Sequence, residues 1–130
     1  MMRHRAGVVL IEEGKIALIK RTVNGKVYFV FPGGGIEADE TPEQAAKREA
    51  FEELGLRVEI ASLLTTVERN GFQYFYVANR VGGRFGSGNG AEFTSGDCRR
   101  GSYEPVWVGL DELNGLDVRP QEVAALLNKS

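Results

Sequence analysis

The feature that most constrains this chain is a run of three glycines, Gly33–Gly35, closely followed by a strongly marked helix. Glycine lets the backbone turn sharply and approach a ligand, so the run predicts a tight turn or a binding loop. The helix is marked by an N-cap, a proline at the first position, a capping-box glutamine and a left-handed glycine after its end: Thr41, Pro42, Gln44 and Gly55. The sequence therefore predicts a helix over 42–54 directly after a glycine turn.

Apolar runs with turn signals between them predict strands on both sides of this helix. The predicted strands are 8–11 and 16–20 in one hairpin, 27–31 before the glycines, 57–68 and 72–81 in a second hairpin, and 103–110. The glycine- and serine-rich stretch 81–102 predicts a long loop, and an amphipathic helix near the end is expected to turn Val123, Leu126 and Leu127 inward. This order indicates one α/β domain over 1–130, with a mixed β-sheet sandwiched between α-helices.

The composition argues against two classes of binding partner and indicates a cellular compartment. The 130 residues carry a net charge of −2, which argues against a nucleic-acid polymer as partner because such domains usually have a strong basic excess. No apolar run approaches the roughly 20 residues that span a bilayer, so no membrane partner is expected. The lone Cys98 fits a reducing, cytoplasmic setting.

The predicted helix gathers three carboxylates, from Glu49, Glu52 and Glu53, on one face. On a helical wheel its apolar side comprises Ala46, Ala50, Phe51 and Leu54. Like charges at this spacing repel, and they lie near the helix C-terminus, where the dipole disfavours negative charge. One interpretation is a solvated acidic face partly offset by Arg48; the other is a site for a hard divalent cation, which carboxylate oxygens bind. The glycine turn beside the helix favours a metal–phosphate site.

The stretch Gly34–Leu56 resembles the Nudix box of the MutT/Nudix hydrolases, in which glycine, glutamate, Arg-Glu, Glu-Glu and a final glycine recur at fixed spacing. The matching positions are Gly34, Glu40, Arg48, Glu49, Glu52, Glu53 and Gly55. The family implies the Nudix fold, an α/β/α sandwich. It also implies hydrolysis of a nucleoside diphosphate linked to another group, with Mg²⁺ or Mn²⁺ as cofactor. One departure is Asp39, where members often carry glycine, and a local backbone adjustment is expected there.

The resemblance also implies roles for individual residues. Glu49, Glu52 and Glu53 would hold or serve the metal, together with a backbone carbonyl at Gly33 or Gly34. Arg48 would orient the carboxylates and Glu40 would support them, so that the catalytic set is Glu49, Glu53, Arg48 and Glu40. Substrate contacts are expected from Arg5, Gly34, Gly35 and Glu92. The general base is left open between Glu49, Glu92 in the glycine-rich loop and Glu104 before the strand at 103–110.

The sequence leaves the substrate open. The candidate substrates are nucleoside triphosphates, including oxidised ones, or ADP-ribose and other sugar nucleotides. The alternative function, from a different class, is a non-catalytic module that senses a nucleotide. Phe72, Tyr74 and Tyr76 share a strand face, where they would either stack on a nucleobase or pack against a helix or a dimer partner. Arg3, Arg5, Lys20 and Arg21 lie near strand ends and are candidates to approach phosphates. The resemblance also favours a homodimer.

Overall fold

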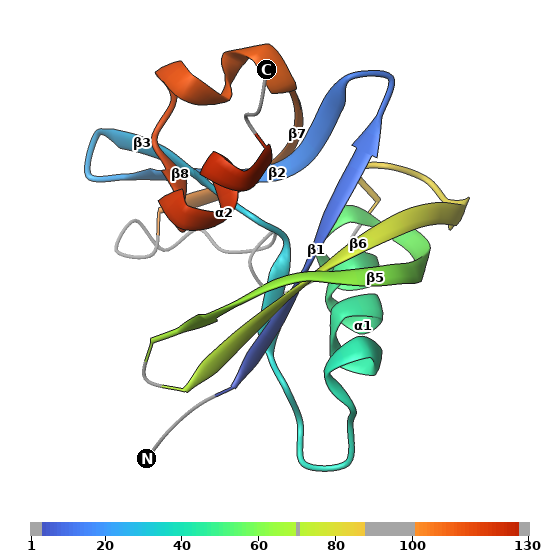
Figure 1. Ribbon diagram of the computed structural model, residues 1–130. Helices are drawn as coiled ribbons and strands as arrows, with labels where there is room; N and C mark the ends of the chain where they lie inside the picture. The colour runs from blue at the N-terminus through green and yellow to red at the C-terminus, as the bar shows by residue number, and fades with distance from the viewer. Residues whose placement is uncertain (1–3, 70, 88–100, 128–130) are drawn as a thin grey trace.

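The computed structural model describes residues 4–69, 71–87 and 101–127. Its helices and strands follow one another around a strongly twisted sheet (Figure 1). In chain order they are β1 Arg5–Glu12, β2 Lys15–Val23, β3 Lys26–Val30, β4 Gly33–Gly35, α1 Pro42–Leu54, β5 Leu56–Glu68, β6 Phe72–Gly83, β7 Ser102–Gly109, the 3-10 helix η2 Leu110–Gly115, β8 Val118–Arg119 and α2 Gln121–Leu127. Both predicted hairpins and the helix over 42–54 are confirmed.

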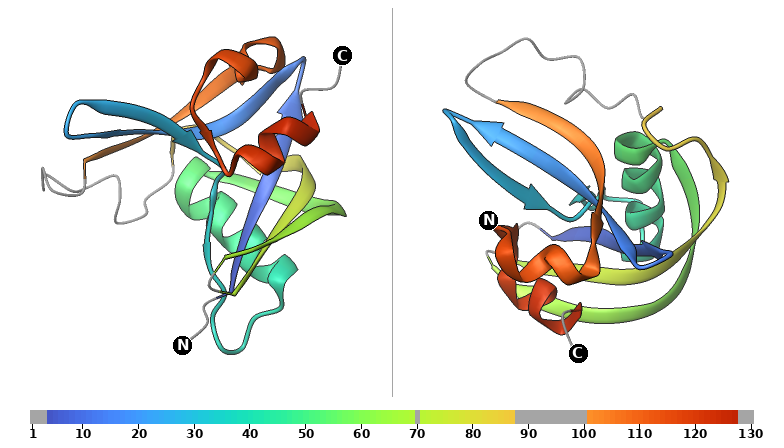
Figure 2. Two further views of the ribbon diagram at one scale, coloured as in Figure 1. Left: turned by 60° about the vertical axis from the view of Figure 1, so that its left-hand side comes forward. Right: turned by 90° about the horizontal axis from the view of Figure 1, so that it is seen from above.

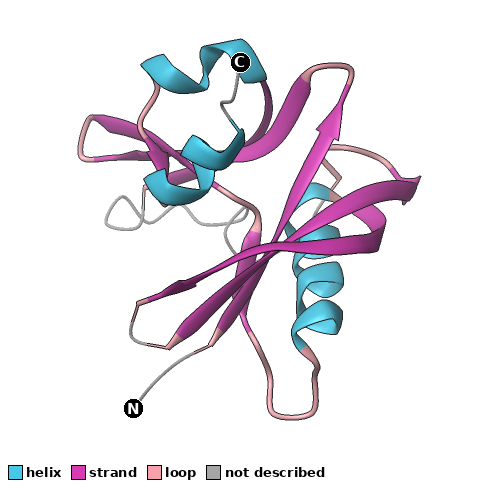
Figure 3. Ribbon diagram, in the orientation of Figure 1, coloured by secondary structure: helices cyan, strands magenta, loops and turns pink. Residues whose placement is uncertain are grey.

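The sheet is mixed, as the sequence predicted. Its strands run in the order β5-β6-β1-β2-β3-β8, with β4 paired to β1 and β7 paired to β2. The β1–β6 and β3–β8 pairs are parallel, and the other pairs are antiparallel. α1 lies on one side of the sheet, and η2 and α2 lie on the other (Figures 2 and 3). The predicted arrangement of a sheet between helices is therefore confirmed.

Alternation along the central strands divides the core into two clusters, because successive side chains of a strand point to opposite faces. Val8 and Leu10 of β1 pack with the alanines of α1, whereas Val9 between them packs with Val123 of α2 on the other face. These β1 residues are fully buried, as expected for a strand covered on both faces. In α2, Val123 is buried as predicted, but Leu126 is 39% exposed.

The predicted long loop at 81–102 is shorter than expected at both ends. Residues Val81–Gly83 continue β6, where Gly82 pairs with Arg57 and Gly83 with Leu56, and Ser102 already belongs to β7. The prediction was wrong there because strand pairing uses backbone groups, which glycine supplies as well as any residue. Much of the remaining stretch, including Glu92 and Cys98, lies outside the described residues.

Within the described parts of the chain, the structure has no helix long and apolar enough to cross a bilayer.

Candidate active site

Local sequence signals fix both ends of α1. The Thr41 hydroxyl accepts a hydrogen bond from the Gln44 backbone N–H at 3.1 Å, and the Gln44 side chain accepts one from the Thr41 N–H at 2.9 Å. At the other end Gly55 adopts a left-handed φ of 78° and donates to the Phe51 carbonyl. The capping box and the C-terminal glycine are thus confirmed, and they set the rotation and length of the helix that carries the carboxylates.

The buried stripe of α1 differs from the predicted one. Phe51, expected in the core, is 48% exposed, whereas the carboxylates Glu49 and Glu53 are only 8% and 7% exposed. Small residues are the reason: Ala45, Ala46 and Ala50 are buried in the core cluster shared with β1, and they let the helix approach the sheet closely. Of the predicted apolar side, Ala46, Ala50 and Leu54 are therefore buried as expected, and only Phe51 is turned outward.

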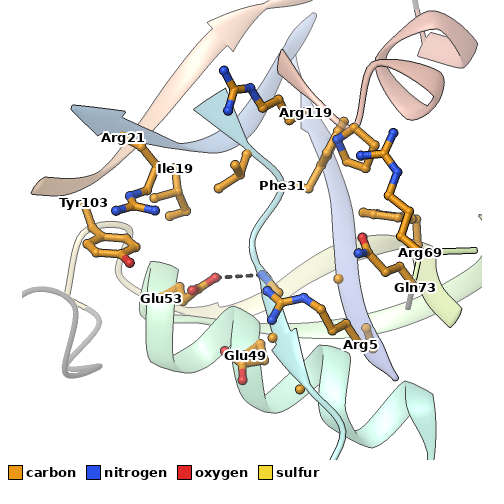
Figure 4. A pocket seen from close by; sticks show the side chains of 18 residues that line it. Arg5, Ile19, Arg21, Phe31, Glu49, Glu53, Arg69, Gln73, Tyr103 and Arg119 are labelled. Carbon is orange, nitrogen blue, oxygen red and sulfur yellow. Dashed lines mark hydrogen bonds between the residues drawn. The ribbon is translucent and has the colours of Figure 1, made fainter. Parts of the chain in front are cut away.

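Glu53 is held by the glycine strand. Its Oε1 accepts a hydrogen bond from the Gly33 backbone N–H at 2.7 Å (Figure 4). This is a short, charge-assisted hydrogen bond, which is about twice as strong as a neutral one. It joins the helix to β4 and orients a buried carboxylate toward the pocket that both elements line.

Glu49 requires glycine at position 34. A Cβ atom on Gly34 would overlap the Glu49 carboxylate, including an approach of 2.9 Å to its Oε1. Gly33 is equally confined, since a Cβ there would lie 2.7 Å from the Gly7 Cα on the neighbouring strand β1. The glycine run is therefore a strand that two neighbours approach closely, rather than a free turn.

Arg48 connects the carboxylates with the loop before the helix. Its Nε and Nη2 donate to the two oxygens of Glu40 at 2.6 and 3.0 Å. Nη1 donates to Glu49 at 3.0 Å and to Glu52 at 3.2 Å, and Nη2 also donates to the Gly35 carbonyl at 2.9 Å. The hydrogen bond to Glu40 is the main cause that raises the pKa of Arg48. This planar fork orients Glu49 through a hydrogen bond to its Oε2.

Replacing Arg48 by lysine is expected to lower the free energy of unfolding by about 2 kcal/mol, because a lysine ammonium keeps the charge but cannot reproduce the forked hydrogen bonds. Urea denaturation measures the change. Arg80→Lys is the matched control: Arg80 makes one exposed ion pair with Glu12 at 3.0 Å, and its loss is expected to cost less than about 1 kcal/mol. Equal losses in the two variants would contradict the organising role of Arg48.

The Arg48–Glu40 pair also predicts a dependence of stability on pH. The hydrogen bond from Arg48 lowers the pKa of Glu40 below its ordinary value of 4.5. The unfolded chain therefore binds a proton more readily than the folded one, so this contribution is full above about pH 4.5 and falls as the pH drops through the folded pKa. The difference in unfolding free energy between the wild type and Glu40→Gln should shrink on acidification, and a constant difference from pH 7 to 3 would refute the assignment.

A pocket of about 530 Å³ is lined by residues of α1 and of the strands β1–β4 and β6–β8. Glu49 and Glu53 line one side, and Phe31 and Phe75 supply apolar surface (Figure 4). Four arginines from four different parts of the chain also line it: Arg5, Arg21, Arg69 and Arg119. Carboxylates on one side and guanidinium groups around them suit a ligand that carries several negative charges.

Several predicted site residues meet in this pocket. Those that line it are Arg5, Arg21, Gly33, Gly34, Gly35, Glu49 and Glu53. Glu40 and Arg48 are absent from the lining; Arg48 holds Glu49 and is itself held by Glu40, whereas the Glu52 side chain is 41% exposed and is paired with Arg48. With the side chains as placed, the described residues contain no group of three or more acidic, histidine or cysteine residues that could hold a metal. The metal role of Glu52 stays a prediction.

Other candidates fall outside the pocket or outside the described residues. Glu104 and Lys20 are paired on β7 and β2, and each is adjacent in sequence to a pocket-lining residue, Tyr103 or Arg21, so alternation places them on the opposite face of the sheet. Glu92 and Arg3 belong to stretches that the structure does not describe. Asp39 does not have a positive φ, so no left-handed adjustment occurs there.

Two of the three aromatic residues singled out on β6 pack as the packing alternative predicted, whereas Phe72 is 37% exposed and stacks on His4. Tyr76 is buried in the cluster with the α1 alanines, and Tyr74 packs against the same cluster. The other face of β6 reaches the pocket, through Gln73 and Phe75. Sequence reasoning missed these two residues together with Arg69, Tyr103 and Arg119. Period-two alternation separates the two faces of β6, but which face meets the pocket depends on the packing of α1.

Comparison with known proteins agrees with this geometry. A family model described as the NUDIX domain matches residues 1–127. A MutT-like protein of Streptomyces ambofaciens is 48% identical over 65 residues, which cover 50% of this chain and 40% of that protein. An 8-oxo-dGTP diphosphatase of Haemophilus influenzae is 40% identical over 93 residues, covering 62% of this chain and 65% of that protein. The matched segments thus span less than two thirds of these relatives' lengths.

Solved structures share the fold at lower sequence identity. A NUDIX hydrolase from Nitrosomonas europaea superposes with a TM-score of 0.75 at 19% identity, over 98% of this chain and 88% of that one. A MutT structure, from a study of the Aliivibrio salmonicida and Vibrio cholerae proteins, gives 0.73 at 20% identity, over 97% and 95%. The predicted Nudix fold is confirmed by these matches. Together with the family model, they show that this chain belongs to the NUDIX domain family.

Proposed function

We propose that this chain hydrolyses a phosphoanhydride bond in a nucleoside diphosphate linked to another group, with a nucleoside triphosphate, oxidised ones included, as the favoured substrate class. The observation that carries the proposal is the pairing of two buried carboxylates with a pocket lined by four arginines. Guanidinium groups bind phosphoryl oxygens through paired N–H bonds, and a carboxylate can accept the proton of an attacking water.

A divalent cation, Mg²⁺ or Mn²⁺, is part of this proposal. The donor set fits such an ion: Glu49 and Glu53 are two buried carboxylates on one side of a pocket whose neighbouring strand consists of glycine backbone. Hard cations prefer carboxylate and carbonyl oxygens, and here Arg48 and the Gly33 N–H hold the two carboxylates in place. Glu49, Glu53 and the Gly33 carbonyl would hold the ion, with Glu52 as a further ligand. When bound, it would lower the pKa of a water molecule and neutralise phosphate charge.

The chain's own residues supply the rest of the mechanism. Arg5, Arg21, Arg69 and Arg119 attract and align the phosphate chain. A water oxygen attacks phosphorus, the bond to the bridging oxygen breaks, and the water proton passes to a carboxylate. Glu49 is the proposed general base because it is buried in the pocket and aligned by Arg48. The Gly33 N–H holds Glu53 beside it.

Substrate choice rests on the named relatives. The relative from Haemophilus influenzae, named an 8-oxo-dGTP diphosphatase, supports a nucleoside triphosphate. A structure titled as an ADP-ribose pyrophosphatase from Streptococcus suis has 20% identity and so bears on the fold alone. A nucleotide-sensing module would tend to lose the glutamates of the Nudix box. In this chain Glu49 and Glu53 are present and buried, which favours an enzyme. A cytoplasmic location and a homodimer complete the proposal.

The test is a hydrolysis screen of the purified chain with Mg²⁺ or Mn²⁺ against nucleoside triphosphates, oxidised nucleotides, sugar nucleotides and dinucleotide cofactors. The proposal expects a nucleoside monophosphate as product, with turnover abolished by a chelator and restored by added metal. Preferential cleavage of ADP-ribose would overturn the substrate class. Thermal stabilisation by nucleotides without cleavage of any of them would indicate that the chain is a nucleotide-sensing module and not an enzyme.

A further inference from the structure

The chain that follows β6 folds back against the C-terminal end of α1 (Figure 2). The Arg84 backbone N–H donates to the Gly55 carbonyl at 3.1 Å, and the Gly86 N–H donates to the Leu54 carbonyl at 2.8 Å. The last carbonyls of a helix have no partner within it, so these two hydrogen bonds close the end of α1. Glu53 is the residue before Leu54, and the closed end therefore lies next to a pocket carboxylate.

The backbone of this segment is shaped to lie close to the helix end. Gly83 has a φ of 90°, and a Cβ atom added to it would lie 2.9 Å from the Leu56 Cα. Ser87 then closes a turn, because its backbone N–H and its hydroxyl both donate to the Arg84 carbonyl, at 3.1 and 2.6 Å. The chain over 83–87 therefore follows the end of α1 at the distance of direct backbone contact.

One side chain anchors this segment to the rest of the protein. Of the described residues 84–87, Phe85 alone is not exposed. Its ring stacks on that of Trp107, with centroids 4.8 Å apart and an angle of 28° between the planes. Both rings pack against the core cluster that contains Leu54. We name Arg84–Gly86 together with Trp107 the helix clamp.

Strand β7 places the helix clamp beside the pocket. Trp107 follows Tyr103 by four residues on this strand, so alternation puts both side chains on the same face of the sheet. Tyr103 lines the pocket, whereas Phe85 and Trp107 are absent from its lining. The helix clamp can therefore affect a ligand in the pocket only through the residues that it holds in place.

We propose that Phe85 is a positioning residue for the reaction. Its stack on Trp107 holds the segment 84–86 against α1, and this keeps the Glu53 Oε1 at 2.7 Å from the Gly33 backbone nitrogen. The last turn of α1 carries Glu53, and it loosens when its carbonyls lose their partners. The effect on catalysis rests on the function proposed above, whereas the position of the Glu53 carboxylate does not depend on that function.

Phe85→Leu tests the helix clamp, because it removes the ring and keeps an apolar side chain. In steady-state kinetics kcat is expected to fall about fivefold to thirtyfold, since a small displacement of a reacting group slows the chemical step. KM is expected to change by less than about twofold, because the ring does not line the pocket. Phe85→Tyr retains the stacking ring and should keep kcat within about twofold of the wild type.

The Gly33 amide proton gives a second measurement, which needs no turnover. A short hydrogen bond to a carboxylate moves the NMR resonance of an amide proton downfield. The Gly33 resonance is therefore expected to move upfield in Phe85→Leu, where Glu53 is held less firmly, and to keep its position in Phe85→Tyr.

Phe29→Leu is the matched control for the loss of a phenylalanine ring. Phe29 is a half-buried residue of β3 that packs against the other core cluster and is absent from the lining of the pocket. This variant is expected to lose stability to urea but to leave both kcat and the Gly33 resonance as in the wild type.

An unchanged Gly33 resonance in folded Phe85→Leu protein would overturn the helix clamp, and so would equal changes in Phe85→Leu and Phe29→Leu. A displaced resonance with unchanged kcat in an active enzyme would overturn the positioning role. If the wild type cleaves no nucleotide and the Gly33 resonance still responds to Phe85→Leu alone, the hydrolytic function fails and the hold of the helix clamp on Glu53 stands.

Discussion

Replacing Glu53 by glutamine is expected to lower kcat by about a hundredfold or more while the fold is retained. Glutamine has the same size, and its amide oxygen can accept the hydrogen bond that the Gly33 N–H now donates at 2.7 Å. What the substitution removes is a negative charge that is 7% exposed and faces the pocket. Steady-state kinetics on the substrate found in the screen, with circular dichroism to check folding, would measure the effect.

The control for this experiment is Glu43→Gln. Glu43 lies in the first turn of the same helix but is exposed, so the variant should keep the activity of the wild type. A folded Glu53→Gln protein with undiminished turnover would remove Glu53 from the site. An equal loss in both variants would show that the change in activity reports general damage to the helix.

Replacing Gly34 by alanine is expected to have the second large effect. The new Cβ would overlap the Glu49 carboxylate, which is the movable partner, so Glu49 should be displaced from the pocket. A displacement of about 1 Å of a reacting group can cost about a hundredfold in rate, and the strain is expected to cost about 1–3 kcal/mol of stability. Kinetics and urea denaturation measure these two effects separately.

Gly115→Ala is the matched control for this substitution. Gly115 lies in η2, and a Cβ added there would meet no atom within 4 Å. Its stability and activity should therefore stay close to those of the wild type. Full activity in Gly34→Ala would mean that the position of Glu49 against the glycine strand does not matter for the reaction.

The helix and its caps could be predicted from the sequence because they depend on near neighbours. Thr41, Pro42, Gln44 and Gly55 act within one turn of α1, and the structure places them as predicted. The wheel was wrong for Phe51 because it ranks residues by hydrophobicity, whereas the close approach of α1 to the sheet depends on small residues. That approach is what buries Glu49 and Glu53.

The pocket wall opposite the carboxylates could not be predicted in the same way. Arg69 lies just after β5, Tyr103 on β7 and Arg119 on β8, and none of them belongs to the motif that marks the family. Tyr103 and Arg119 lie on the same part of the sheet because β7 and β3 pair with β2, and β8 pairs with β3. The register of those pairings is set by contacts between residues far apart in the chain.

The sequence by itself determined the identity and spacing of the helix carboxylates, the glycines beside them and the arginine that links them, because all of these lie within one continuous stretch. Only the tertiary structure decided that Glu49 and Glu53 are buried while the Glu52 side chain is 41% exposed, and that Arg21 lies against the Tyr103 ring and donates to the Tyr28 hydroxyl. The physical reason is that burial and stacking depend on how α1 and four strands pack together, which no local pattern contains.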